Sequence, residues 1–301
     1  MRKFLLLLLC LLCLPATAQG AQLSDDAGNT ISFSAPFTRI ISLYPAHTEN
    51  LYSLGLRDEI IGVSTSEDFP SGILNKPRFN ARDGVEKFLA ATPDLILIRP
   101  MHLAAHPALW DALRRRGIQV LALQPPTIPE MYAYWRKLGR LTGRELNAEE
   151  MISDFKTGLE KAASRLELVP ENKRPGVFFE SIHRKCATFS PGSMPMFVLE
   201  MAGGRNVADD AKPNNDSNIA NYGLERVLLR GQRIDVYLAQ YGAMNEVEVR
   251  DITNAPAASR IKAVRDRNVF LVDEHLVSRP TMRLLEGIET VHQLLYPGGI
   301  R

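Results

Sequence analysis

Short apolar runs alternate with amphipathic segments along most of the chain. The segments 47–55 and 84–92 repeat apolar residues at helical spacing. Uninterrupted apolar strands separated by helices are typical of a parallel sheet covered on both faces. The pattern therefore predicts an α/β lobe in the first half of the chain. Its predicted strands are residues 39–44, 59–64, 94–99 and 118–123.

A longer amphipathic segment interrupts this alternation. Residues 148–168 keep apolar side chains at helical spacing until Pro170, and Asn147 with Glu150 forms a variant of the capping box. The segment predicts one helix about 30 Å long, which is the width of a small domain. We therefore place the domain boundaries at this helix. The predicted units are a signal peptide (1–18), an N-terminal α/β lobe (19–143), an inter-lobe helix (144–172) and a C-terminal α/β lobe (173–301).

The strand and helix alternation resumes after the long segment, with strands predicted at 176–181, 235–240 and 268–273. The stretch GVEKFLAATPDLILI from Gly84 is echoed by GLERVLLRGQRIDVYLA from Gly223. Glu86 and Glu225 occupy the same place in the two copies. The echo predicts two similarly built lobes, although short amphipathic units also converge by chance.

The first residues predict the compartment. Arg2 and Lys3 precede an apolar run that is too short to span a bilayer, and the small residues 16–18 fit a cleavage site. Cys10 and Cys13 lack the small residue that normally precedes a lipidated cysteine. We expect export by a cleavable signal peptide, without a lipid anchor. Cys186 would then be the one remaining cysteine, so no intrachain disulfide is expected.

The charge balance narrows the class of partner. The chain has 36 Lys and Arg residues against 34 Asp and Glu residues, and cleavage of the signal peptide would make the two sets equal. Nucleic-acid and membrane surfaces attract proteins with an excess of basic residues. The composition therefore argues against both kinds of partner.

Five stretches that follow one another along the chain carry a resemblance to a known family. They are RIISLYPAHTENLYSLGL, KPRFNARDGVEKFLAATPDLILI, FSPGSMPMFVLEMAGGRNV, GLERVLLRGQRIDVYLA and RPTMRLLEGIETVHQLLYP. In this order they resemble the periplasmic binding proteins of iron-complex and corrinoid ABC importers. The resemblance implies two Rossmann-like lobes with central parallel sheets joined by one long α-helix. It also implies a periplasmic, monomeric receptor without enzymatic activity, whose partner is an ABC importer permease dimer with its ATPase subunits.

The resemblance gives the repeated glutamates a role. In the family, a glutamate on each lobe docks onto arginines of the permease, and Glu86 and Glu225 fall on those positions. Carboxylates that meet arginines form charge-assisted hydrogen bonds, and one contact per lobe fixes orientation. The alternative is that each glutamate only complements a helix dipole, which contributes about 0.3–1 kcal/mol.

The ligand is expected between the lobes, because open parallel sheets bind ligands beyond the carboxyl ends of their strands. The loops there mix aromatic, hydroxyl and cationic side chains, which suits an iron or cobalt chelate better than a bare ion. No resident cofactor and no protein metal site are expected. The candidate ligand-binding residues are Tyr44, His47, Phe69, Phe79, Arg82, Arg99, His102, Thr188, Ser193, Tyr241, His275 and Arg279.

Individual residues of this set have alternative roles. His47 either contacts the ligand or satisfies groups at a helix start, and the arginines at 82, 99 and 279 either bind anionic groups or lie solvated on the surface. Family members that bind haem often carry a tyrosine where this chain has Phe79, so haem is disfavoured. Cys186 is expected to be a small buried residue.

An exported enzyme and an oxyanion-binding protein are the two rival functions. The chain lacks a Gly-x-Ser-x-Gly elbow, a phosphate-binding loop and a His-Glu-x-x-His motif, which argues against an exported enzyme. An oxyanion such as molybdate or tungstate would need a small pocket of amides and hydroxyls, to which residues 190–193 could contribute. A continuous helix between lobes resists bending, so only a small closure on ligand binding is expected.

Overall fold

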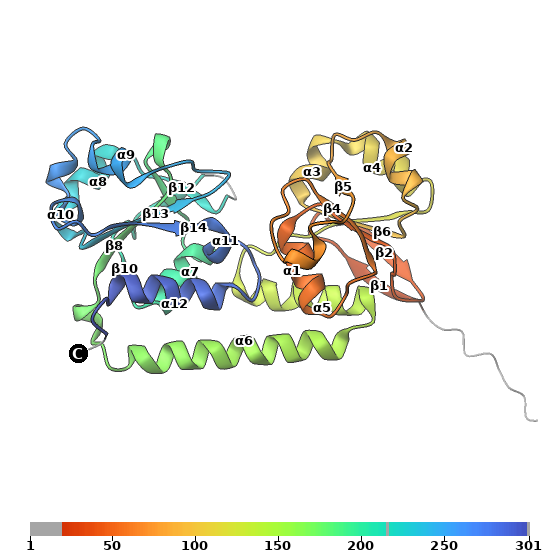
Figure 1. Cartoon of the computed structure of the whole chain (residues 1–301), viewed down its shortest axis with the longest axis horizontal. Coiled ribbons are helices and arrows are strands. Elements are labelled where there is room, and N and C mark those ends of the chain that lie inside the picture. The colour runs from red at the N-terminus through yellow and green to blue at the C-terminus, as the bar shows by residue number, and fades with distance from the viewer. Residues whose placement is uncertain (1–19, 215–216, 300–301) are drawn as a thin grey trace, which may run out of the picture.

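Two lobes stand side by side above one long helix, α6 (Glu145–Leu166), which runs beneath both of them (Figure 1). The structure, a computed structural model, describes residues 20–214 and 217–299. The predicted signal peptide, with Cys10 and Cys13, lies outside the described residues. No helix in the described part of the chain is both long and apolar enough to cross a membrane.

The first lobe is built on a five-stranded parallel sheet with the order β5-β4-β3-β6-β7. Its central strands consist of buried aliphatic residues, as expected for a sheet covered on both faces. A hairpin, β1 (Ala21–Ser24) and β2 (Thr30–Phe33), precedes the sheet. The remaining elements are β3 (Ile40–Ser42), α1 (Pro45–Ser53), β4 (Ile60–Ser64), β5 (Arg78–Phe79), α2 (Val85–Ala90), β6 (Leu95–Ile98), α3 (Pro100–Ala105), α4 (Pro107–Arg114) and β7 (Gln119–Ala122).

The second lobe has a mixed sheet with the order β11-β12-β9-β8-β13-β14, and β10 pairs with β8. The strands β8, β13 and β14 are parallel, as predicted, and the short strand β10, which was not predicted, joins them in parallel. By contrast, β9 and β12 join antiparallel. The antiparallel extension was missed because its strands are only two or three residues long. The elements are β8 (Gly176–Ile182), β9 (Ala187–Phe189), α7 (Met194–Met201), β10 (Arg205–Asn206), β11 (Lys212–Pro213), β12 (Ile219–Asn221), α8 (Leu224–Leu229), β13 (Val236–Tyr241), α9 (Val249–Thr253), α10 (Lys262–Arg265), β14 (Val269–Asp273), α11 (Glu274–Val277) and α12 (Leu284–Leu295).

The long helix was predicted, but the helix before it was not. Helix α5 (Ile128–Thr142) carries apolar residues at helical spacing and ends at Gly143, whose φ of 66° is left-handed. It packs against α6, where the rings of Trp135 and Phe155 meet edge to face. The capping box predicted at Asn147 is wrong, because α6 begins at Glu145 and Asn147 lies within its first turn.

One buried apolar cluster connects the two lobes. It extends from the sheet of the first lobe through α5 and α6 into α7 and α12 of the second lobe. Two further clusters fill the other faces of the two sheets. A shared core on the α6 side favours a fixed relative position of the lobes. Short 3-10 turns complete the fold at Ser71–Ile73, Glu171–Lys173, His183–Lys185, Gly231–Arg233 and Ala258–Arg260.

Candidate functional site

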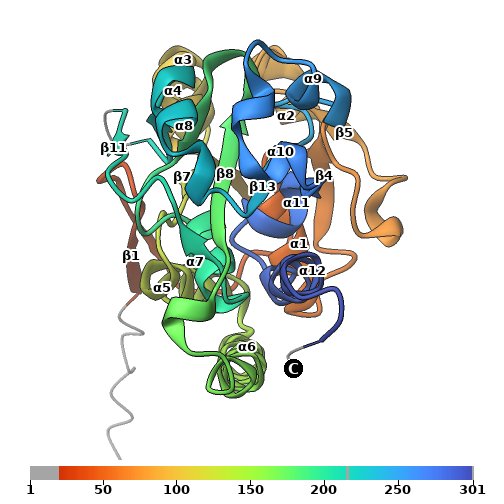
Figure 2. The same ribbon diagram turned by 90° about the vertical axis from the view of Figure 1, so that its left-hand side faces the viewer.

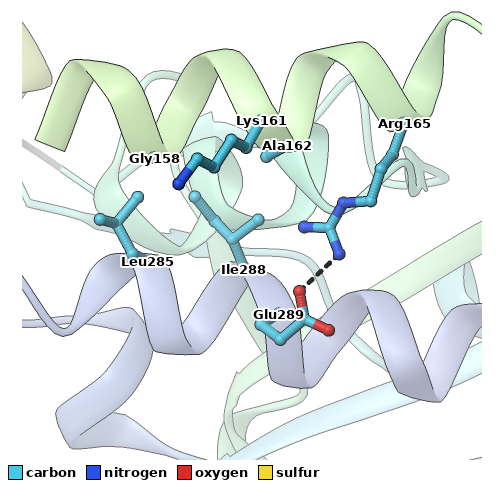
Figure 3. A pocket seen from close by; sticks show the side chains of 7 residues that line it. All are labelled: Gly158, Lys161, Ala162, Arg165, Leu285, Ile288 and Glu289. Atoms are coloured by element: carbon cyan, nitrogen blue, oxygen red, sulfur yellow. Dashed lines mark hydrogen bonds and ion pairs between the residues drawn. The ribbon is translucent and has the colours of Figure 1, made fainter. Parts of the chain in front are cut away.

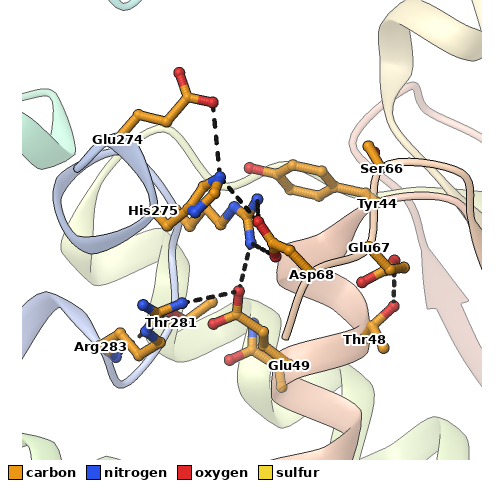
Figure 4. Close-up of polar contacts among 12 residues, drawn as sticks. Tyr44, Thr48, Glu49, Ser66, Glu67, Asp68, Glu274, His275, Thr281 and Arg283 are labelled. Atoms are coloured by element: carbon orange, nitrogen blue, oxygen red, sulfur yellow. Dashed lines mark hydrogen bonds and ion pairs between the residues drawn. The ribbon is translucent and has the colours of Figure 1, made fainter. Parts of the chain in front are cut away.

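Charged side chains from the two lobes meet where the lobes face each other (Figure 4). Arg279, in the connection between α11 and α12, donates from Nη1 to Glu49 Oε1 at 2.7 Å and to Asp68 Oδ1 at 3.0 Å. Glu49 lies on α1 and Asp68 follows β4, so both ion pairs join one lobe to the other. These contacts lie at the carboxyl ends of parallel strands, where ligands of such sheets bind.

Two further side chains of the second lobe complete this group. His275 Nε2 lies 3.1 Å from Asp68 Oδ2, and Arg283 Nη1 lies 3.9 Å from Glu49 Oε1. Arg283 also covers the ring of Phe69, with 4.6 Å between the guanidinium carbon and the ring centroid. We call Glu49, Asp68, His275, Arg279 and Arg283 the interlobe clamp.

Neutral hydrogen bonds reinforce the clamp. The backbone oxygen of Pro280 accepts a hydrogen bond from Asn50 Nδ2 at 3.0 Å and another from Trp135 Nε1 at 3.4 Å. Asn50 is fully buried and Trp135 belongs to the shared apolar core. The turn that carries Arg279 is therefore held by both charge and packing.

Burial raises the pKa values of the two clamp carboxyl groups, whereas pairing with Arg279 lowers them. Burial raises the pKa of Glu49 above its usual range, and the hydrogen bond from Arg279 only partly offsets this rise. Partial burial alone would raise the pKa of Asp68, but the hydrogen bonds and charge of Arg279 outweigh it and hold that pKa below its usual range. The carboxylate of Asp68 is thus the more firmly ionised of the two.

A second carboxyl group lies behind the clamp in the first lobe. Glu67 Oε1 accepts a hydrogen bond from Thr48 Oγ1 at 2.8 Å, while Oε2 has no partner among the described residues. Burial raises the pKa of Glu67 to about 7, against hydrogen bonds from Thr48 and Ser64 that lower it. This carboxyl group therefore titrates near neutral pH.

Some of the residues predicted to bind ligand do lie on the interlobe face. Tyr44 caps α1, and Figure 4 shows its hydroxyl directed toward the second lobe and His275. The guanidinium of Arg99 lies over the Tyr44 ring, 4.8 Å from its centroid, and Arg99 Nε donates to Gln124 Oε1. His275 and Arg279 belong to the clamp, so their side chains already have acidic partners.

Four predicted ligand residues lie in the interior instead. His47 is fully buried, with one ring nitrogen 2.7 Å from Tyr134 Oη and the other 3.1 Å from the Ile98 oxygen. Burial lowers the pKa of His47 to about 3, so its ring stays neutral. Phe79 packs on Phe88, Thr188 donates to the Phe179 oxygen, and Ser193 is buried at the start of α7. We remove these four from the candidate ligand set because none presents a side chain to solvent.

Arg82 and His102 lie neither in the interior nor beside the clamp. Arg82 is exposed in the loop before α2, and its amide donates to Asn80 Oδ1. His102 is half-buried in α3, and its carbonyl oxygen accepts a hydrogen bond from Trp110 Nε1 at 2.8 Å. Neither side chain contacts the clamp. Cys186 is a free, half-buried thiol whose pKa burial raises.

The two repeated glutamates occupy equivalent positions. Glu86 is the second residue of α2 after Gly84, and Glu225 is the second residue of α8 after Gly223. Both side chains are exposed, and neither has an ion-pair partner among residues 20–214 and 217–299. Figures 1 and 2 show α2 and α8 on the side of the lobes that faces away from α6.

The sequence did not single out Glu49, Glu67 or Arg283. Glu67 and Asp68 both lie in the loop 66–69, which was expected to face the ligand, but neither was among the predicted ligand residues. The acidic residues in this region could have suggested partners for Arg279, although 230 residues separate Glu49 from it. Within the part of the chain described, no group of three or more His, Cys, Asp or Glu side chains is placed to hold a metal ion.

A shallow groove lies elsewhere, between α6 and α12 (Figure 3). It is lined by Gly158, Ala162, Leu285 and Ile288, with the ion pair Arg165–Glu289 at 2.5 Å across it. The groove lies between two helices and away from the carboxyl ends of the parallel strands. We therefore do not assign the ligand to it.

Comparisons with known proteins agree with this architecture. A family model described as periplasmic binding protein matches residues 40–276. YvrC of Bacillus subtilis, an uncharacterized ABC transporter substrate-binding lipoprotein, is 25% identical over 280 residues, which are 91% of this chain and 85% of YvrC. A vitamin B12-binding protein of Vibrio cholerae is 26% identical over 260 residues, which are 85% of this chain and 88% of that protein.

A solved structure shows the same fold. It is a Staphylococcus epidermidis protein described as a possible iron-binding, periplasmic solute-binding protein. The two structures superpose with a TM-score of 0.75 at 27% identity, over 87% of this chain and all of the other. The two-lobe arrangement around a long helix is therefore shared with a protein of known structure.

Proposed function

The chain belongs to the periplasmic binding protein family, and on that premise we propose that it is the extracytoplasmic substrate-binding component of an ABC importer. Its ligand is a metal chelate, either a ferric siderophore or a corrinoid, held between the lobes. The names of two relatives, a substrate-binding lipoprotein and a vitamin B12-binding protein, support the transport role. Neither name describes an enzyme, which supports a function without catalysis.

The observation that carries the ligand proposal is a pair of exposed aromatic side chains, one on each lobe. Phe69 follows β4 and is 43% exposed, and Tyr241 ends β13 and is 42% exposed. Arg99 stacked on Tyr44 adds a flat cationic surface to the first lobe. Aromatic and cationic groups together suit a bulky ligand with an apolar body and polar edges.

The oxyanion alternative has less support. Such a ligand would use hydroxyl groups and amides in a small pocket, and the hydroxyl groups of Thr188 and Ser193 are buried. The exposed aromatic side chains of Phe69 and Tyr241 would have no role in binding an oxyanion. A metal chelate therefore remains the better match to the exposed chemistry of this face.

Docking to the permease is assigned to Glu86 and Glu225. Both carboxylates are exposed, lack an ion-pair partner in the described residues and sit at the same place in equivalent helices. Exposed carboxylates without an intramolecular partner are free to meet arginines of another protein. One contact on each lobe would fix the orientation of the receptor on a permease dimer with its ATPase subunits.

The receptor is proposed to act after export, as a monomer. The relative YvrC is named a lipoprotein, so the expectation that this chain lacks a lipid anchor gains no support from that relative. Mass spectrometry of the protein purified from whole cells would distinguish a cleaved form without a lipid from a lipidated one.

Native mass spectrometry of the mature protein tests the ligand proposal. The ligands are a corrinoid, a ferric trihydroxamate, a ferric tricatecholate, haem and molybdate, each offered at micromolar concentration. We expect one chelate bound per chain, most readily the corrinoid or the trihydroxamate. Binding of molybdate alone, or of nothing to a protein that circular dichroism shows to be folded, would overturn the proposal.

A further inference from the structure

The face between the lobes holds more acidic than basic side chains. Glu49 contacts both clamp arginines and Asp68 contacts Arg279. His275 has two more carboxylates near it, Asp273 at 3.2 Å and Glu274 at 3.8 Å. Arg283 has an additional acidic neighbour, Glu286, at 3.7 Å. Carboxylates therefore outnumber guanidinium groups in this cluster.

The charged side chains of this cluster that are most open to solvent are carboxylates. The side chain of Arg279 is 10% exposed, whereas that of Asp68 is 40% exposed. Arg283 lies against the Phe69 ring, and the side chain of Asp273 is 30% exposed. A ligand that approaches the clamp would therefore meet acceptor oxygens and negative charge first.

An anionic ligand would also have to compete with the contacts that join the lobes. An anion that takes the Nη1 donors of Arg279 must displace Asp68 or Glu49, which accept from Nη1 at 3.0 Å and 2.7 Å. A displaced carboxylate would stay close to other carboxylates without a compensating charge, which is unfavourable in a partly buried place. A neutral N–H or O–H donor, by contrast, can bond to the remaining lone pairs of Asp68 without breaking either ion pair.

Arg99 is the cation that could offset this excess. It has no carboxylate within ion-pair distance in the described part of the chain, and it is bonded to Gln124 and stacked on Tyr44. One guanidinium can balance one negative edge of a ligand. It cannot balance three negative charges beside the carboxylates of the clamp.

We infer that the site selects neutral or cationic chelates over polyanionic ones, and that Asp68 determines this selectivity. The inference rests on the proposed function, since it concerns the charge of the chelate held between the lobes. It favours corrinoids, whose edges carry neutral amides, and ferric hydroxamates. It disfavours ferric catecholates and other chelates with several negative charges.

Calorimetric titration with three iron chelates of different charge tests the inference. The probes are a neutral ferric trihydroxamate, a cationic ferric trihydroxamate and a trianionic ferric tricatecholate, with a corrinoid as a further neutral ligand. For the wild-type protein at low ionic strength we expect the trianion to bind at least about tenfold more weakly than the neutral chelates, from Coulomb repulsion at contact distances of several ångströms.

The variant Asp68→Asn should reduce the difference in affinity between the neutral and trianionic chelates by about tenfold, because it removes one of the repelling charges. It should also weaken the cationic chelate relative to the neutral one. Asp111→Asn is the matched control, since Asp111 is an exposed residue of α4 whose partner is Arg114. That control should leave all affinities unchanged.

A salt titration of the wild-type protein avoids dependence on any variant. Added salt should strengthen binding of the trianion and weaken binding of the cation, because it screens repulsion and attraction alike. A trianion that binds as tightly as the neutral chelates, or equal effects of Asp68→Asn on all probes, would overturn the inference and leave the proposed function standing. If no probe binds to the folded protein, the proposed function itself is overturned.

Discussion

The interlobe clamp and the outer face use the same kind of side chain in opposite ways. In the clamp, Glu49 and Asp68 are paired with Arg279 at 2.7 and 3.0 Å, and Glu49 is almost completely buried. On the outer face, Glu86 and Glu225 are exposed and lack ion-pair partners in the described chain. Paired and buried charges fix the shape of one molecule, whereas exposed and unpaired charges are available to a second one.

The difference also determines what mutations can reveal. A buried charge that loses its partner is destabilising, because the remaining charge is left without water or compensation. An exposed carboxylate is solvated, so its removal changes the fold little. Variants of the clamp should therefore change stability, and variants of the outer face should change association.

The largest expected effect comes from Arg279→Met. The substitution leaves Glu49 buried without its closest cation and removes two of the ion pairs that join the lobes. We expect a loss of roughly 3–5 kcal/mol in the free energy of unfolding, measured by chemical denaturation, together with a larger radius of gyration in X-ray scattering. Arg165→Met is the control, because the Arg165–Glu289 pair also joins α6 to the second lobe but is exposed, and its loss should cost less than about 1 kcal/mol. Equal losses of unfolding free energy in the two variants would contradict the distinction between buried and exposed ion pairs.

A smaller, pH-dependent effect is expected at Glu67, behind the clamp. Its pKa is raised from 4.5 to about 7 by burial, so between these values the folded protein holds a proton that the unfolded chain has released. The stabilisation from Glu67 is therefore complete below pH 4.5 and is lost as pH rises through 7. In Glu67→Gln this loss disappears.

Chemical denaturation of both proteins at several pH values measures the effect. The difference in free energy of unfolding, wild type minus Glu67→Gln, should fall by roughly 2–3 kcal/mol as pH rises across that window. Glu150→Gln, at an exposed position on α6, is the control and should follow the wild type. Parallel pH curves for wild type and Glu67→Gln would show that Glu67 does not titrate there.

The smallest effect on the fold is expected at the outer face. Glu86→Lys and Glu225→Lys should each change the free energy of unfolding by less than about 0.5 kcal/mol and leave ligand affinity unchanged, since both side chains are solvated. In a reconstituted importer, however, each should reduce ligand uptake several-fold, and together they should nearly abolish it. Glu150→Lys, on the opposite side of the molecule, controls for the added positive charge. Normal uptake by the double variant would refute docking through these glutamates.

Local patterns in the sequence predicted much of the fold. Continuous apolar runs predicted the longer parallel strands of both sheets but not the two-residue strands β5 and β10. The apolar spacing of 148–168 predicted the long helix, which the structure places at Glu145–Leu166. These features depend on neighbours in sequence. The helix α5 was missed although Met131, Tyr134, Trp135, Leu138 and Leu141 show the same spacing, so this signal was present but not used.

The ligand residues were harder to predict because strand order gives a loop but not the direction of its side chains. His47 follows β3 as expected, yet its ring turns inward to Tyr134, which lies 87 residues away. Phe79 likewise turns inward because Gly62 leaves room for its ring, where an added Cβ would lie 2.4 Å from Cε2. Such contacts depend on elements that are far apart in the chain.

The sequence by itself determined the alternation of the main parallel strands with helices, the long helix between the lobes and the equivalent positions of Glu86 and Glu225, because each depends on periodicity or on a local repeat. Only the tertiary structure decided that Arg279 and His275 are partners of Glu49 and Asp68, and that His47 is neutral and buried. Pairing and burial depend on which distant segments pack together. A residue type predicts what a side chain can bind, whereas its surroundings in the fold decide what it does bind.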